Sequence, residues 1–170
     1  MRVLGVRIGL PVLLFDIFKG WISASYGLLF SLFPEGSEQL MQISILLGIM
    51  AVTGHIYPAF AGFRGGKGVA SIFGVLLALA PVQTLCAGGI FIIVLLITKY
   101  VSMASITAGI SFPVLINLIL VSSHSSLRWF SVLVAILLLV THFKNIRRLL
   151  QGKENKASFL FRKKAREDDV

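Results

Sequence analysis

The sequence predicts an all-α protein: a polytopic helix bundle that crosses a membrane about six times. Hydrophobic residues make up 56% of its 170 residues and charged residues only 14%, whereas about a quarter of the residues in a soluble domain are charged. A transmembrane helix needs roughly 20 apolar residues, so this length allows about five or six crossings joined by short loops. Little room remains for a soluble catalytic domain, and any chemistry is therefore expected in or beside the bilayer.

Two crossings are predicted before the glycine-rich part of the chain. The first spans about residues 8–33 and carries Asp16 and Lys19, whose spacing of three places them on one helical face. We expect these two side chains to pair, because two opposite charges near the interface cost less to bury together than apart. An acidic turn follows at residues 34–38, and the second predicted crossing spans about residues 40–60.

The apolar stretch 69–98 fits either one long crossing or two short ones that turn at Pro81, since proline tends to end a helix. Two further crossings are expected at about residues 102–121 and 127–143. The remaining residues, 144–170, hold nine Lys or Arg against four Asp or Glu, a net +5 within a chain whose net charge is +9.

Charge distribution decides between the two interpretations of residues 69–98. Under the positive-inside rule the basic tail, residues 144–170, faces the cytoplasm, and the loops before it alternate between the two sides. Only a hairpin at Pro81 then places the loop around Lys67 on the same side as the tail. We therefore predict six segments in a transmembrane domain of residues 1–143, followed by a cytoplasmic tail.

This topology gathers polar residues at the cytoplasmic ends of the segments. They are Arg2, His55, Arg64, Lys67, Ser105, His142 and Asn145. Polar residues concentrated at one membrane face favour a site where a phosphorylated, water-soluble ligand meets a lipid. The basic balance of the chain agrees with an anionic leaflet or an anionic substrate, and in a membrane protein it does not indicate nucleic acid.

The loop at residues 62–68 has the composition of an anion-binding site. Its four glycines allow successive backbone N–H groups to converge, and Arg64, Lys67 and the start of a helix near Val69 add positive charge. It is not a nucleotide-binding P-loop, because Gly68 stands where that motif requires Ser or Thr. The alternative interpretation is a flexible cytoplasmic turn whose cations only reflect topology.

Four polar residues near predicted helix ends have more than one interpretation. His142 and Asn145 are three apart and can address one ligand group, or they form an interfacial polar pair. His55 belongs to the site or is a helix-end histidine bound to a neighbouring carbonyl. Ser105 lies early in its crossing, where Ser102 is the better candidate for a helix cap.

No metal site and no cofactor are expected. The three histidines are dispersed, and the single cysteine, Cys86, lies in an apolar run, so the usual spacing of metal ligands is absent from the sequence.

The stretch from Gly54 to Ser71 resembles the central motif of the bacterial membrane glycerol-3-phosphate acyltransferases that use acyl phosphate, the PlsY type. The family pattern Gly-His-x-x-Pro-x-Phe-x-Gly-Phe-Lys-Gly-Gly-Lys-Gly-Val-Ala-Thr is matched with Arg64 in place of Lys and Ser71 in place of Thr. Further matches, in the family's order, are residues 16–20, 100–105 and 142–149, so that the resemblance covers nearly all of residues 2–153.

The resemblance implies a seven-helix fold with its active site at the cytoplasmic face of a bacterial inner membrane. It also implies the transfer of a fatty acyl group from acyl phosphate to glycerol 3-phosphate in phospholipid biosynthesis, with lysophosphatidic acid and inorganic phosphate as products. The implied partners are glycerol 3-phosphate, acyl phosphate, membrane lipids and the enzyme that supplies the acyl phosphate.

Residue roles are carried over by the same resemblance. The expected substrate-binding residues are Arg2, Lys67, Ser105, His142 and Asn145, of which Lys67, Ser105 and His142 are candidate catalytic residues. The donor phosphate is expected at the loop that comprises His55, Gly62, Arg64, Gly65, Gly66 and Gly68. His142 is a general-base candidate by its pKa class, or it only binds while the phosphate of the substrate accepts the proton.

The sequence departs from the family at its beginning. Family members start with a further helix and a loop of Gly-Ser-Gly-Asn-x-Gly-Ala-Thr-Asn type before the arginine that Arg2 matches, whereas this sequence starts at Met1. The resemblance thus implies an N-terminally truncated member. Two alternatives to an active enzyme stay open: an inactive truncated acyltransferase and a small organic-phosphate transporter, which should contain internal repeats.

Overall fold

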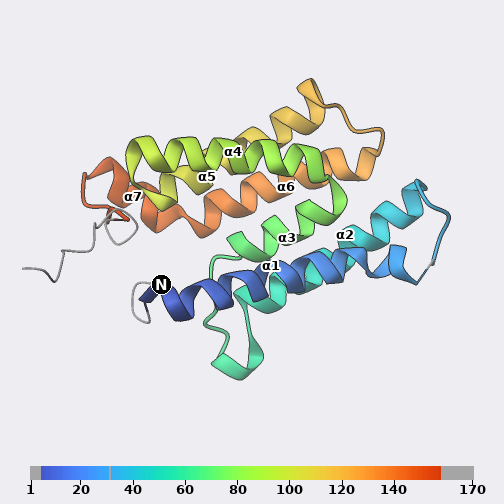
Figure 1. Cartoon of the computed structure of the whole chain (residues 1–170), viewed down its shortest axis with the longest axis horizontal. Coiled ribbons are helices and arrows are strands. Elements are labelled where there is room, and N and C mark those ends of the chain that lie inside the picture. The colour runs from blue at the N-terminus through green and yellow to red at the C-terminus, as the bar shows by residue number, and fades with distance from the viewer. Residues whose placement is uncertain (1–4, 31, 158–170) are drawn as a thin grey trace, which may run out of the picture.

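The computed structural model describes residues 5–30 and 32–157, and helices dominate both ranges (Figure 1). The elements are α1 (Gly5–Leu29), α2 (Glu38–Ile56), a short 3-10 turn (Ala59–Ala61), α3 (Val69–Leu79), α4 (Pro81–Thr98), α5 (Val101–Val114), a π-helical turn (Leu115–Ile119), α6 (Ser125–Thr141) and α7 (Phe143–Leu150). None of the described residues forms a β-strand, so the all-α prediction is confirmed.

Most of these helices are long and apolar enough to cross a membrane. Four stretches meet that criterion alone: Arg7–Gly27, Glu38–Ala61, Pro81–Thr98 and Val101–Ile119. Helices α6 and α7 meet it together but are bent by 61° at His142, and α3 is a shorter apolar helix. With the bent pair and α3 counted, the described part of the chain has the six segments that the charge distribution predicted.

The hairpin predicted at Pro81 is present and explains why α3 is short. Pro81 is the first residue of α4. A backbone N–H at this position makes no hydrogen bond within the helix, so proline, which lacks that N–H, costs nothing there. Helix α3 has 11 residues and so rises only about 16 Å. It is therefore shorter than a full membrane crossing, and the glycine-rich loop precedes its first residue, Val69.

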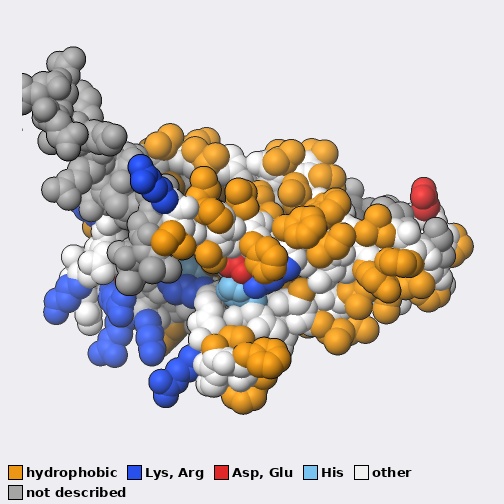
Figure 2. All heavy atoms as spheres, turned by 60° about the horizontal axis from the view of Figure 1, so that its bottom comes forward, with side chains coloured by type: hydrophobic (Ala, Val, Ile, Leu, Met, Phe, Trp, Pro, Cys, Tyr) orange, Lys and Arg blue, Asp and Glu red, His pale blue; other side chains and the backbone are white. Residues whose placement is uncertain are grey.

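The core lies between the helices, while apolar side chains also cover the outside. Phe112, Ile116 and Val75 are almost completely buried. Large apolar side chains such as Phe15, 66% exposed, stand on the outer surface, which Figure 2 shows as broad hydrophobic areas. An apolar exterior is what a bilayer solvates, because lipid tails replace the protein core as partners of these side chains.

Helices α1 and α3 make the most extensive helix contact among the described elements, and two glycines permit it. A Cβ atom at Gly20 would collide with the Ser71 carbonyl oxygen, and one at Gly74 would collide with the Ile17 carbonyl oxygen. Small residues let helix backbones approach each other in membranes, where dispersion contacts rather than the hydrophobic effect hold helices together.

The two ends of the bundle are closed differently. At the end where α1 and α2 connect, Glu38 of α2 accepts hydrogen bonds from the backbone N–H (2.7 Å) and hydroxyl (2.5 Å) of Ser126 at the start of α6. At the opposite end, where α7 lies (Figure 1), the Ala157 N–H donates to the Lys99 carbonyl at 2.8 Å. The first part of the basic tail, residues 144–157, therefore packs back on the bundle.

Candidate active site at the α7 end of the bundle

A lysine from the glycine-rich loop meets an asparagine from α7. Lys67 Nζ donates to Asn145 Oδ1 at 2.7 Å, although the two residues are 78 positions apart. The loop before α3 supplies the lysine, and the 61° bend between α6 and α7 turns the asparagine towards it. The structure thus joins two of the residues that the sequence placed at one membrane face.

A buried carboxylate continues this contact and orients the asparagine. Glu154 is 8% exposed, and its Oε1 accepts from Asn145 Nδ2 at 2.8 Å and from Ser102 Oγ at 2.9 Å. Because a carboxylate only accepts and an ammonium only donates, Asn145 must turn its amide nitrogen to Glu154 and its oxygen to Lys67. These four residues form one continuous hydrogen-bonded chain, here called the polar chain.

Two members of the polar chain were not predicted from sequence. Glu154 stands in the predicted basic tail, and its only sequence signal is that it is the one acid among the basic residues just after α7. Ser102 was expected to cap a helix, but Tyr100 is the N-cap residue of α5 and the Ser102 hydroxyl donates to Glu154 instead. The capping prediction is therefore wrong.

His142 lies at the bend between α6 and α7 and is 2% exposed. Its Nδ1 is 2.9 Å from the Leu138 carbonyl oxygen, and its own carbonyl accepts from the Asn145 N–H at 2.8 Å. A carbonyl can only accept, so Nδ1 carries a proton and the neutral ring keeps its lone pair on Nε2. Such a histidine can accept a proton at Nε2 without losing the bond that orients it.

Ser105 lies one turn after Ser102 and thus on the same face of α5. It is buried, and its hydroxyl donates to the Val101 carbonyl at 2.9 Å. Helix α5 also packs against α7. The hydroxyl oxygen keeps a free lone pair for a further donor.

The glycine-rich loop differs from the expected open anion site in two of its N–H groups. Gly65 N–H donates to the Ile56 carbonyl (3.1 Å) and Gly66 N–H to the His55 carbonyl (3.3 Å). Gly62 and Gly68 adopt left-handed φ angles of 59° and 77°, which glycine reaches without strain. Two of the glycines therefore serve backbone packing and two serve the turn.

Two more predicted residues stand apart from the polar chain. Arg64 is exposed at the tip of the loop. His55 contacts Lys19 Nζ at 2.8 Å and Asp16 Oδ1 at 3.3 Å through its Nδ1, so this nitrogen has side-chain partners rather than the neighbouring carbonyl of the alternative interpretation. The predicted pairing of Asp16 with Lys19 is confirmed at 2.6 Å. Arg2 lies outside the described residues.

Charge is distributed unevenly over the surface. Figure 2 shows Lys and Arg side chains gathered over the α7 end, with an acidic side chain at the far end of the bundle. The described basic residues at the α7 end include Lys144, Arg147, Arg148, Lys153 and Lys156. The α7 end is therefore the basic end of the described structure.

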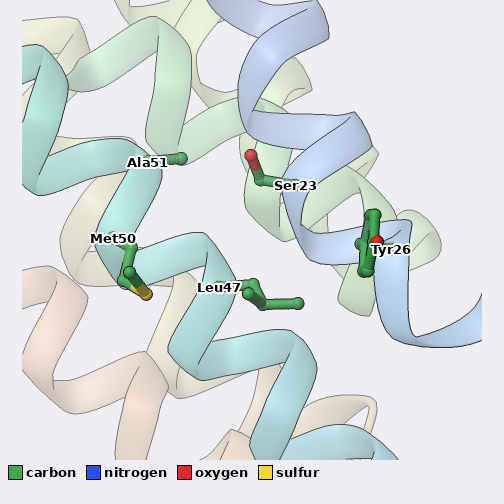
Figure 3. Close-up of a pocket in the computed structure, with 5 residues that line it drawn as sticks. All are labelled: Ser23, Tyr26, Leu47, Met50 and Ala51. Carbon is green, nitrogen blue, oxygen red and sulfur yellow. The ribbon is translucent and has the colours of Figure 1, made fainter. Parts of the chain in front are cut away.

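A shallow groove of about 240 Å³ runs between α1 and α2. Ser23 and Tyr26 of α1 face Leu47, Met50 and Ala51 of α2 across it (Figure 3). Its walls are mainly apolar, and it lies within the stretches of α1 and α2 that are apolar enough to cross a membrane. It is a lipid-facing groove rather than a site for a charged ligand.

Residues 1–152 match the family described as glycerol-3-phosphate acyltransferase. The chain belongs to this family. Among its relatives, the glycerol-3-phosphate acyltransferases of Chlorobium limicola and Chlorobaculum tepidum are 37% and 39% identical, each over 93% of this chain. The matches cover 79% and 78% of the lengths of those acyltransferases.

The acyltransferase fold is also found in two solved structures. They are crystal structures of PlsY (YgiH), an integral membrane glycerol 3-phosphate acyltransferase, in its lysophosphatidic acid and glycerol 3-phosphate forms. Each has a TM-score of 0.82 at 33% identity over 95% of this chain, and the match covers 80% and 78% of the respective PlsY chains. The chain is therefore an integral membrane protein with the PlsY fold.

Proposed function

We propose that this protein transfers a fatty acyl group from acyl phosphate to glycerol 3-phosphate and so forms lysophosphatidic acid and inorganic phosphate. The observation that carries the proposal is the polar chain itself: Lys67, Asn145, Glu154 and Ser102 joined at one end of a membrane bundle, with His142 one turn from Asn145. Membership of the glycerol-3-phosphate acyltransferase family supplies the class of acceptor.

The proposed reaction depends on the positioning of its two substrates and needs no covalent intermediate with the protein. Acyl phosphate is an activated mixed anhydride, so the glycerol hydroxyl oxygen can attack the acyl carbon directly. A new carbon–oxygen ester bond forms, the bond between the acyl carbon and the phosphate oxygen breaks, and inorganic phosphate leaves. Holding both reactants in line and neutralising their phosphates accounts for most of the acceleration.

Lys67 is suited to the phosphate of glycerol 3-phosphate. Its ammonium carries three donors, one of which bonds Asn145. The bond to Asn145 also orders the long lysine side chain before substrate arrives, which reduces the entropy lost on binding. Arg2, matched by resemblance to a substrate-binding position, is the proposed second cation.

His142 is proposed to receive the proton of the attacking hydroxyl at Nε2. The hydrogen bond from Nδ1 to the Leu138 carbonyl holds the ring in the tautomer whose free lone pair is on Nε2. The second route, in which His142 only binds and a phosphate oxygen of the substrate accepts the proton, uses the same residues. A general base is worth about 10²- to 10⁴-fold in rate, so the two routes predict different losses for His142→Gln.

The charge at the α7 end supports a proposal for the location of the protein. We infer a bacterial inner membrane with the basic tail in the cytoplasm, where glycerol 3-phosphate is present and where cations face an anionic leaflet. The acyl chain of the donor then remains in the lipid phase while its phosphate reaches the loop of His55, Gly62, Arg64, Gly65, Gly66 and Gly68.

The proposal is tested by measuring lysophosphatidic acid formed by the purified chain from acyl phosphate and labelled glycerol 3-phosphate. His142→Gln is expected to lower kcat by about 10²-fold or more if it is the general base. Lys156→Ala, which removes an exposed cation outside the polar chain, is the matched control. No product from acyl phosphate, or equal use of acyl-CoA as donor, contradicts the proposed function.

A further inference from the structure

A second polar cluster lies between α1 and α2, outside the polar chain. Lys19 Nζ is 2.6 Å from Asp16 Oδ1 and 2.8 Å from His55 Nδ1, and Asp16 Oδ1 is 3.3 Å from His55 Nδ1. The side chains of Asp16 and His55 are each 17% exposed. Ionisable groups within a membrane bundle are costly to keep, so their presence suggests a function.

The partners of His55 decide which of its nitrogens carries the proton. A lysine ammonium only donates, so its 2.8 Å contact requires Nδ1 of His55 to accept. The shorter contact, to Lys19, therefore favours the tautomer of His55 that carries its proton on Nε2.

The Nε2 atom of His55 faces the main chain of the glycine-rich loop. A Cβ atom at Gly66 would collide with His55 Nε2, and one at Gly65 would collide with the His55 carbonyl oxygen. The same carbonyl accepts the Gly66 N–H at 3.3 Å. The loop thus rests on both the backbone and the ring of His55, and the next residue is Lys67.

We propose that Asp16 and Lys19 are positioning residues that hold His55 in its Nε2–H tautomer beneath the glycine-rich loop and so set where Lys67 enters the site. The effect of this positioning on catalysis rests on the proposed function. The tautomer of His55 and the position of the loop do not depend on it and can be measured without activity. Without Lys19, the remaining partner of Nδ1 is Asp16, which only accepts, so the proton should move to Nδ1.

The tautomer can be read directly from ¹⁵N NMR of histidine-labelled protein, with His55→Gln to assign the signals. In the wild type we expect a protonated Nε2 and an unprotonated Nδ1, and in Lys19→Met a protonated Nδ1. Arg7→Met, which removes an exposed cation from the same helix, should leave the His55 signals unchanged. A wild-type His55 protonated at Nδ1, or unchanged signals in Lys19→Met, overturns the proposal.

The position of the loop gives a second readout that needs no activity. Amide hydrogen exchange at Gly66 should become about tenfold faster in Lys19→Met, and the KM for glycerol 3-phosphate should rise by a similar factor with kcat less affected. Lys19→Arg keeps a donor, so it should keep the tautomer and most of the activity, and it serves if Lys19→Met fails to fold.

The outcomes separate this inference from the proposed function. A changed tautomer with unchanged Gly66 exchange contradicts the positioning role. An inactive wild-type protein with the expected spectra contradicts the proposed function alone.

Discussion

Single residues in the site are oriented by partners that can play only one hydrogen-bonding role. Lys67 only donates and Glu154 only accepts, so Asn145 between them has one orientation. Resemblance had selected Lys67 and Asn145, but nothing in the sequence said that they would touch. A contact across 78 positions depends on where the α6–α7 bend carries Asn145, and that is a tertiary property.

Replacing Lys67 tests its proposed role in binding the acceptor phosphate. A hydrogen bond to a charged group is worth about 1.5–3 kcal/mol, so Lys67→Ala should raise the KM for glycerol 3-phosphate roughly tenfold to one-hundredfold. Steady-state kinetics with each substrate varied in turn provide the measurement. Lys156→Ala is the control. A KM for glycerol 3-phosphate that is unchanged in Lys67→Ala would contradict the proposed role of Lys67.

Replacing Glu154 tests the polar chain as a structural unit. Glu154→Ala leaves Asn145 Nδ2 and Ser102 Oγ without their acceptor, and a buried unsatisfied group costs about 1–3 kcal/mol. We expect a lower free energy of unfolding in detergent, measured by thermal or denaturant unfolding, and reduced activity. The adjacent exposed Lys153→Ala is the control, and equal stability of the two variants would contradict this account.

At the scale of elements, close helix packing and a loop conformation depend on glycine for different reasons. In α1 and α3 the small residues allow two backbones to touch, whereas in the loop Gly65 and Gly66 allow the chain to lie on His55. The sequence predicted the loop as an anion site because glycine content cannot distinguish a converging set of N–H groups from a close backbone contact. The described hydrogen bonds assign the N–H groups of Gly65 and Gly66 to carbonyls.

A matched pair of glycine substitutions tests the contact between α1 and α3. A Cβ at Gly74 would collide with the Ile17 carbonyl, so Gly74→Ala should destabilise by about 1–3 kcal/mol or more. At Gly89 in α4 a Cβ would meet no described atom within 4 Å, and Gly89→Ala should be neutral or stabilise by up to about 1 kcal/mol. Unfolding of the two variants under one set of conditions gives the comparison, and equal effects would rule out this packing.

At the scale of the whole molecule, the bundle separates its charges between two ends. The turn at residues 34–38 lies at one end, and the polar chain, the Lys99 carbonyl and the packed part of the tail lie at the other. The positive-inside rule then predicts that the second end faces the cytoplasm.

Cysteine labelling tests this sidedness. In a Cys86→Ser background, Glu35→Cys should react with a membrane-impermeant maleimide from outside intact cells. Lys153→Cys should react only after the membrane is permeabilised, because the packed part of the tail is expected in the cytoplasm. Labelling of both positions from the same side would contradict the six-segment topology.

The sequence by itself determined the class of the molecule, its six segments and its family, because hydropathy, charge placement and four local motifs are properties of adjacent residues. It also predicted the pairing of Asp16 with Lys19, which one helical turn brings together. Only the tertiary structure decided that Glu154 and Ser102 complete the polar chain and that His55 joins Asp16 and Lys19. Those contacts join side chains from different elements, and the packing of the bundle rather than the local pattern sets the distances between them.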